Sequence, residues 1–385
     1  VDHGGRRRGR RRGSGRGRGQ VAPRHHDRVT APAHLERGPY AFRVTDELRP
    51  LRDRLPPTAV PRIPEGPDGI RWRPLSADDA AVVTELAERI SARDHPTWSE
   101  SLDEIREELG HSWVDPGRDG MLAFDTEGTA VAWGLVVAPP NPESLVRVIL
   151  FGGVDPAYRG RGIGRRLLDW QHARARAMLA SSDLALPAWV LSYAADRAPE
   201  HGRLLHHAGF EPARYFTTLE ADLAEPTPFA ALPDGLRVVP FAPELSEPVR
   251  AAKNAAFADH WGSQPASQEG WESMQGLSSF RRDLSRVALE GDEVVGFVVS
   301  EVNEDDWERQ GSRSGYIALV GTVRAWRGRG LASALLAEVL EAYRAVDLER
   351  AVLDVDADNP TGALGVYTRL GFAPTARDVS YRVSY

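Results

Sequence analysis

The chain has no cysteine among its 385 residues. This absence excludes disulfide bonds, thiolate zinc sites and a cysteine nucleophile. Lysine is almost absent as well, because Lys253 is the only one and arginine supplies the other positive charges. We attribute this bias to GC-rich coding, so runs of arginine are weak indicators of function.

Long apolar runs are also missing. No stretch is long enough to cross a membrane and no secretory pattern is present, which predicts a cytoplasmic protein without a membrane partner. The 42% of hydrophobic residues is typical of soluble globular proteins with sizeable cores. A length of 385 residues allows two or three domains.

Charge is unevenly distributed along the chain. Residues 1–28 hold ten arginines and two aspartates, a charge of +8, which leaves −15 for the rest of a chain of net charge −7. Residues 6–18 (RRRGRRRGSGRGR) are low in complexity, and residues 38–68 carry scattered prolines. We expect residues 1–68 to form a solvated, disordered tail. Nucleic-acid binding through this tail is the less favoured alternative.

A glycine- and arginine-rich turn follows an apolar segment near the C-terminus. Residues 315–323 (GYIALVGTV) are almost all apolar, which predicts a strand buried on both faces. Residues 324–330 (RAWRGRG) follow, and apolar residues then recur at helical spacing between positions 331 and 343. The first turn of a helix has backbone N–H groups without partners, so this strand–turn–helix arrangement is suited to binding phosphate.

The spacing in this turn discriminates between phosphate ligands. A P-loop requires a Gly-Lys-Ser/Thr ending, and the dinucleotide fingerprint requires Gly-x-Gly-x-x-Gly; neither is present. The pattern that fits is Arg-x-x-Gly-x-Ala, formed by Arg327, Gly330 and Ala332. Residues 359–372 then supply Asn-x-x-x-Ala-x-x-x-Tyr-x-x-x-Gly-Phe. In this order and at this separation, the two motifs resemble the GNAT acyltransferase superfamily.

The resemblance implies that acetyl-CoA is the co-substrate, with its pyrophosphate on the turn and its pantetheine arm on the end of the preceding strand. The residues it assigns to acetyl-CoA are Gly321, Thr322, Val323, Arg327, Gly328, Arg329, Gly330, Leu331, Ala332 and Asn359.

The same motif occurs earlier in the chain. Residues 159–164 (RGRGIG) follow the apolar residues 145–154, and Gly209-Phe210 repeats Gly371-Phe372. This first copy assigns acetyl-CoA binding to Val154, Arg159, Gly160, Arg161, Gly162 and Gly164. Two copies at this separation predict tandem domains. We expect an α/β (α+β) protein with two GNAT folds at 69–224 and 236–385, each a mixed, mostly antiparallel sheet flanked by helices, joined by a proline-rich linker at 225–235.

In the family, the tyrosine of the second motif donates a proton to the leaving CoA thiolate. This residue is Tyr367, and a phenol of pKa about 10 is protonated at neutral pH. A core position in a helical stripe is the alternative role for Tyr367. The first copy has Leu205 there and Arg197 in place of Asn359, which predicts a catalytic second copy and a degenerate first copy that retains CoA at most.

The sequence does not identify which residue is the base that deprotonates the acceptor amine. Four candidates are Glu301, Asp354, Asp259 and His260. Residues 354–359 resemble the start of a calcium loop but lack its glycine and its final glutamate, so we expect no metal site. We expect the acceptor to be an amine, small or peptidic, and the protein to be a monomer or homodimer. A non-catalytic acyl-CoA-binding or regulatory module is the rival interpretation.

Overall fold

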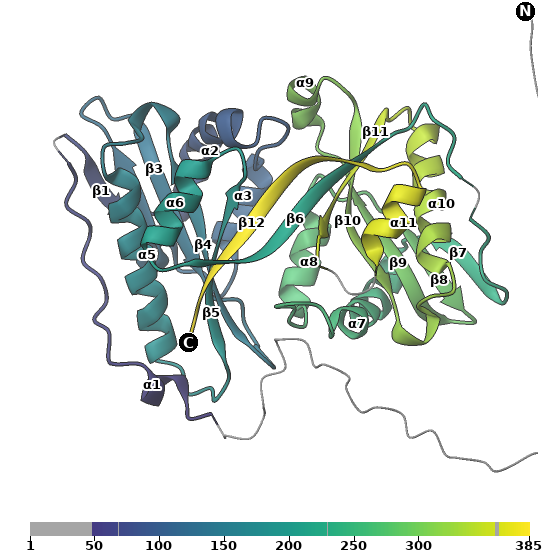
Figure 1. The fold of residues 1–385 in the computed structure, drawn as a ribbon, viewed down its shortest axis with the longest axis horizontal. Coiled ribbons are helices and arrows are strands. Elements are labelled where there is room, and N and C mark those ends of the chain that lie inside the picture. Colours follow the sequence, from purple (N-terminus) through teal and green to yellow (C-terminus); the bar gives the residue numbers. More distant parts are fainter. Residues whose placement is uncertain (1–47, 68, 229, 359–361) are drawn as a thin grey trace, which may run out of the picture. The chain divides into compact units, whose positions relative to one another are not determined.

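One twelve-stranded sheet runs through the part of the chain that the structure describes (Figure 1). The structure is a computed structural model that describes residues 48–385 except 68, 229 and 359–361. The strand order is β1-β2-β3-β4-β5-β12-β6-β11-β10-β9-β8-β7. Only the β4–β5 and β10–β11 pairs are parallel. The predicted mixed, mostly antiparallel sheet with flanking helices is therefore confirmed.

The first half of the described chain supplies one end of the sheet. Its strands are β1 (Arg71–Pro74), β2 (Gly120–Phe124), β3 (Ala130–Val137), β4 (Val146–Val154), β5 (Ala188–Ala195) and β6 (Glu211–Asp222). Its helices are α1 (Leu51–Arg54), α2 (Ala80–Asp94), α3 (Leu102–Gly110), α4 (Pro116–Asp119), α5 (Ile163–Ala180) and α6 (Pro199–His207), with 3₁₀ turns at Ala77–Asp79 and Pro156–Tyr158.

The second half repeats this order. Its strands are β7 (Leu236–Pro240), β8 (Arg286–Glu290), β9 (Glu293–Glu301), β10 (Ser314–Thr322), β11 (Arg350–Asp356) and β12 (Ala373–Ser384). Its helices are α7 (Ser246–Phe257), α8 (Gln268–Gly276), α9 (Trp307–Gln310), α10 (Leu331–Ala345) and α11 (Ala363–Arg369), with 3₁₀ turns at Pro243–Leu245, Glu304–Asp306 and Arg324–Trp326.

Burial on both faces, which the apolar run at residues 315–323 predicts for β10, is partial in β10 and complete in β3. Every residue of β3 is buried, because helices cover both faces of the sheet at this point. On one face, Gly134 of β3 lies so close to α5 that a Cβ there would stand 2.7 Å from a methyl carbon of Leu167 and 2.8 Å from the Nε2 atom of Gln171. Within the described residues, no helix is long and apolar enough to cross a membrane.

Each half of the sheet is completed by a strand from the other half. Residues 378–384 of β12 pair with β5, and residues 216–222 of β6 pair with β11. Figure 1 shows β6 and β12 side by side, and they also pair with each other. The proposed boundary at residues 225–235 divides the sequence repeat, whereas the sheet continues across it. The two copies thus share one backbone hydrogen-bond network.

The predicted disordered tail extends too far toward the C-terminus. Leu51 is fully buried in the core of the first half, and its N–H donates to the carbonyl of Leu184 at 3.0 Å. The prediction is therefore wrong around residues 51–55. Leu55 packs against the same core, so the helical spacing of Leu51 and Leu55 was the available signal, although two leucines among prolines and arginines are too few to stand out. Residues 1–47, with the arginine-rich segment, lie outside the described residues.

Candidate active site

Both glycine turns lie between a strand and the helix that follows it. α5 is preceded by Gly162 at φ 80°, and α10 is preceded by Gly330 at φ 84°, both in the left-handed region. Neither helix has a side-chain cap at its first turn. The backbone N–H groups of both first turns therefore remain available to a bound anion. This is the geometry that the sequence predicted for the pyrophosphate.

The first arginine of each motif is held by hydrogen bonds within the chain. Arg159 Nε donates to the Val154 carbonyl at 3.1 Å, and its guanidinium forms a two-pronged ion pair with Asp94 of α2, at 2.6 and 2.9 Å. Arg327 Nε donates to the Thr322 carbonyl at 3.3 Å in the same way. These contacts within the chain give both arginines a structural role, while their assignment to acetyl-CoA stays a prediction. They fix the strand end that faces the ligand.

The second arginine of each motif lies over an aromatic ring. The guanidinium carbon of Arg161 is 4.8 Å from the ring centre of Tyr158, and that of Arg329 is 4.8 Å from the ring centre of Trp326. Such stacking holds a guanidinium in place while its edge stays available to an anion. Arg161 and Arg329 therefore remain candidates for binding the phosphates.

The parallel strands of each copy separate before they reach the turn. β4 pairs with β5 only as far as Ile149 and Leu191, and β10 pairs with β11 only as far as Tyr316 and Val352. Beyond these rungs, one edge of β4 and one edge of β10 face a gap. Backbone groups on that edge can bind an extended ligand as a neighbouring strand would.

The direction of the backbone groups corrects part of the predicted pantetheine contact. The Val323 N–H donates to the Val295 carbonyl on β9, and alternation directs the Gly321 N–H to β9 as well. The groups that face the gap belong to Val320 and Thr322 and, in the first copy, to Gly152 and Val154. Gly321 is required for packing, because a Cβ there would stand 2.2 Å from the Phe297 ring.

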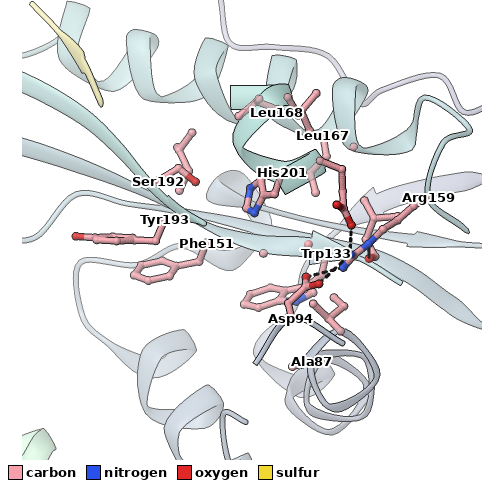
Figure 2. A pocket seen from close by; sticks show the side chains of 18 of the residues that line it. Ala87, Asp94, Trp133, Phe151, Arg159, Leu167, Leu168, Ser192, Tyr193 and His201 are labelled. Atoms are coloured by element: carbon pink, nitrogen blue, oxygen red, sulfur yellow. Dashed lines mark hydrogen bonds and ion pairs between the residues drawn. The ribbon is translucent and has the colours of Figure 1, made fainter. Parts of the chain in front are cut away.

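A cavity of about 520 Å³ lies in the first copy (Figure 2). Five of the six residues predicted to bind acetyl-CoA in this copy line it: Val154, Arg159, Gly160, Gly162 and Gly164. Sequence reasoning missed His201 and Trp133, which also line it. Figure 2 shows Arg159 beside Asp94 in the pocket, with His201 reaching in from α6. In the repeat, His201 corresponds to Ala363, so the exchange of alanine for histidine was the available signal.

His201 makes stability depend on pH. Its pKa is lowered from 6.5 to about 4, first by burial and then by the positive charges of Arg159 and His95. The carboxylates of Asp94 and Glu200 raise the pKa and offset only part of this shift. The unfolded chain takes up this proton near pH 6.5 and the folded chain only near pH 4, so the free energy of unfolding should fall as the pH drops through this range. Denaturant titration at pH 7 and about pH 5 should show a smaller loss for His201→Gln. A loss of stability in His201→Gln as large as that of the wild type would contradict this role of His201. His207→Gln, which changes an exposed histidine, is the control.

Tyr367 is largely buried at the start of the last turn of α11. Its side chain is 8% exposed and packs edge-to-face against Phe372, with ring centres 6.0 Å apart. Burial raises the pKa of this phenol to about 12, so it is protonated at neutral pH. The Phe372 N–H donates to the Tyr367 carbonyl, as the Phe210 N–H does to the Leu205 carbonyl. Leu205 therefore occupies the equivalent place, where it is fully buried.

The structure narrows the candidates for the base. Asp259 lies 3.1 Å from both Arg324 and Arg327 and so belongs to the scaffold of the turn. Burial, followed by the charge of Arg327, lowers the pKa of His260, whose ring packs against Phe257. Asp259 is thereby excluded as the base. The lowered pKa keeps the His260 imidazole neutral and able to accept a proton, so Glu301, Asp354 and His260 remain candidates.

Two further predictions concern residues 354–359. Asp356 and Asp358 lie 3.8 and 3.1 Å from Arg214, so two of the three carboxylates of the rejected calcium-loop pattern have an arginine partner. Asn359, predicted to contact CoA, lies outside the described residues.

Comparison with known proteins decides the family. Residues 84–185 and 250–372 both match the model of the acetyltransferase (GNAT) family. The chain belongs to this family, with two tandem copies. The prediction of an acyl-CoA-dependent N-acyltransferase is thereby confirmed.

Relatives of similar length share both copies. The mycothiol acetyltransferase of Nocardia farcinica is 29% identical over 81% of this chain and 97% of its own length. That of Thermobispora bispora is 31% identical over 68% of this chain and 82% of its own. Among solved structures, a GCN5-related N-acetyltransferase from Sphaerobacter thermophilus has a TM-score of 0.64 at 26% identity and covers 83% of this chain and 97% of its own. A tandem GNAT protein of the clavulanic acid biosynthesis pathway, at 17% identity and TM-score 0.59, covers 82% and 98% and shares the fold.

Proposed function

We propose that the second copy transfers the acetyl group of acetyl-CoA directly to a primary amine, with Tyr367 as the general acid. The observation that carries this proposal is the difference between the copies at one position. A buried, protonated phenol stands in the second copy where the first has a fully buried leucine. Leucine cannot give a proton to a thiolate, so the two copies differ in the one group that the departing CoA requires.

The proposed reaction needs no covalent enzyme intermediate. The neutral amine attacks the thioester carbonyl carbon, and the N–H groups of Val320 and Thr322 on the open edge of β10 are the donors that could stabilise the developing oxyanion. The C–S bond then breaks, and the phenol of Tyr367 protonates the thiolate. The nitrogen of the new amide releases its extra proton to solvent, the amide and CoA leave, and solvent returns a proton to the phenolate.

For the first copy we propose retention of acyl-CoA without catalysis. Its support is the 520 Å³ cavity, whose lining includes the predicted glycine turn and the gap-facing Val154. For the acceptor, the name shared by the relatives points to a mycothiol precursor, cysteinyl-glucosaminyl-inositol, whose amine belongs to its cysteinyl group. We take this compound as the first acceptor to assay.

Calorimetric titration of acetyl-CoA into the full chain tests this assignment. Ala332→Glu and Gly164→Glu place a carboxylate at the second position of α10 and α5, where it repels the CoA phosphates, and the matching glutamine variants control for size. We expect two sites in the wild type, affinity weakened at least about tenfold at one site in each glutamate variant, and turnover lost in Ala332→Glu alone.

Other outcomes would contradict parts of the proposal. Turnover lost in Gly164→Glu but retained in Ala332→Glu would move catalysis to the first copy. Binding at both sites without turnover of any primary amine would favour the rival acyl-CoA-binding module. The absence of any binding would overturn the proposed function as a whole.

A further inference from the structure

Three polar side chains meet where β10 separates from β11. Tyr316 lies on the last paired rung of these strands, opposite Val352 of β11 and opposite Glu301 of β9. Its phenol donates to Asp354 Oδ2 at 2.9 Å, and Asp354 Oδ1 accepts from Thr218 of β6 at 2.6 Å. One residue beyond the rung, the register of β10 against β9 shifts between Ile317 and Leu319. The hydroxyl–carboxylate pair thus stands at the start of the gap.

The equivalent rung of the first copy has no such pair. Val137 of β3 lies opposite Ile149 of β4, and Ile149 pairs with Leu191 of β5. These three residues occupy the places that Glu301, Tyr316 and Val352 have in the second copy. The residue two positions after Leu191 is Tyr193, in the place of Asp354. Valine, isoleucine and tyrosine therefore stand where the second copy has glutamate, tyrosine and aspartate. The polar group is confined to the copy that also has Tyr367.

The surroundings of the pair are acidic. The pKa of Tyr316 is raised well above 10, first by burial and then by Asp354, Glu301 and Asp378. Burial, with Glu104 of α3, raises the pKa of Glu301 to about 7. His95, after α2, lies 3.9 Å from Asp378 of β12, and Asp356 on β11 faces Arg214. Tyr343 of α10 donates its hydroxyl to the Tyr316 carbonyl. A neutral phenol bonded to a carboxylate among these groups favours a cationic ligand.

We propose that Tyr316 and Asp354 bind the ammonium group of the acceptor and remove its proton, which makes Tyr316 a catalytic residue and Asp354 a positioning residue that acts through it. This inference rests on the proposed function, because it requires transfer at the second copy. It deepens that function by assigning the residues that bind the acceptor's ammonium group and remove its proton.

The proton moves in two linked transfers. The ammonium N–H donates to the phenol oxygen of Tyr316 while the phenol O–H passes its proton to Asp354 Oδ2, so the nitrogen lone pair is freed and Tyr316 stays neutral. The amine then attacks the thioester carbon as described above. After the amide leaves, Asp354 releases its proton to water. One ammonium and one thioester give one amide, one thiol and one proton.

Steady-state kinetics of the full chain test the pair, with acetyl-CoA and cysteinyl-glucosaminyl-inositol as the probe substrates. We expect Tyr316→Phe and Asp354→Asn to lower kcat/KM for the amine by about 10²- to 10³-fold near pH 7, the range for loss of a general base. The dissociation constant of acetyl-CoA should stay within about twofold, because neither side chain is placed against CoA.

The pH profile separates proton removal from a structural role. In both variants, kcat/KM should rise about tenfold per pH unit up to the pKa of the amine, because only amine already deprotonated in solution can react. The wild-type profile should level off at lower pH. Thr218→Val removes the other hydrogen bond of Asp354 and keeps the pair, so it should cost less than about fivefold. Asp354→Glu should recover part of the lost rate.

Other results of these kinetic experiments would each contradict a different claim. Variants that match the wild type in rate and pH profile would overturn the inference while transfer itself stands. If Glu301→Gln loses the wild-type pH profile of kcat/KM and Tyr316→Phe retains it, the base is Glu301 and the inference is overturned as well. A parallel drop at every pH would reduce the pair to a structural role. A wild-type chain that binds acetyl-CoA yet acetylates no amine would overturn the proposed function.

Discussion

A shortened chain in which residues 48–217 are joined through Asn-Gly to residues 377–385 is expected to fold alone, whereas residues 48–224 are not. The shortened chain keeps the first half of β6 and adds the part of β12 that pairs with β5. Thr217 lies opposite Arg377 in the β6–β12 ladder, so a two-residue turn joins the two strands in their existing register. Residues 48–224 have the boundary that the sequence repeat suggests but lack this strand.

The expected effect is large because of what β12 covers. Its residues 378–384 pair with seven consecutive residues of β5, and Tyr381, Val383 and Tyr385 pack against the core of the first half. These side chains are partly buried, so each contributes at most the roughly 1.5–3 kcal/mol of a fully buried apolar side chain, against a total stability of about 5–15 kcal/mol for a domain. Circular dichroism and denaturant titration of both chains measure the difference. Cooperative unfolding of residues 48–224 alone would contradict the exchange of strands.

The sequence predicted the local elements at the turns because their signals are local. A glycine at positive φ before each helix, an apolar strand ahead of it and an aromatic at the repeated Gly-Phe are all features of adjacent residues. Positions 162 and 330 require left-handed backbone, and glycine adopts this conformation at little cost. The same reasoning correctly placed Leu205 and Tyr367 at equivalent points of the two copies.

The exchanged strands could not be predicted in this way. β6 and β12 have the same place in each copy of the repeat, so pairing within a copy and pairing across copies satisfy the same alternation of residues. The choice depends on how the two cores pack, which no short segment encodes. The contacts of Arg159 and Arg327 within the chain could not be predicted for a related reason. Their partners Asp94 and Ala256 lie 65 and 71 residues away, so the turn alone suggests a free guanidinium.

The acid–base residues show a third limit. Asp354 and Glu301 were candidates from the sequence, but Tyr316 was counted only as part of a buried strand. Its position opposite Glu301, and its reach to Asp354 on the far side of the gap, follow from the register of three strands and a bulge. Register is a property of the assembled sheet, so a hydroxyl in an apolar run could not be recognised beforehand as part of a polar site.

Replacement of Tyr367 by phenylalanine should lower kcat by about 10²- to 10³-fold, the range typical of a lost general acid. Phenylalanine keeps the packing against Phe372, so we expect the free energy of unfolding to change by less than about 1 kcal/mol. Because the pKa of Tyr367 is about 12, the wild-type kcat should show no decrease from loss of this proton up to about pH 10. Loss of thioester absorbance follows the reaction.

Two comparisons make this result specific to the proton. Tyr381→Phe removes a phenol hydroxyl at the core of the first copy and should leave kcat unchanged, so a loss there would indicate damage spread through the shared sheet. Titration of acetyl-CoA into Tyr367→Phe should still show both sites, because the glycine turns bind through backbone groups and the phenol acts only on the leaving thiolate. If instead kcat stays within about threefold of the wild type, the thiolate takes its proton from another donor. Tyr367 would then keep only its packing against Phe372, the core role that its place in the helical stripe also allows.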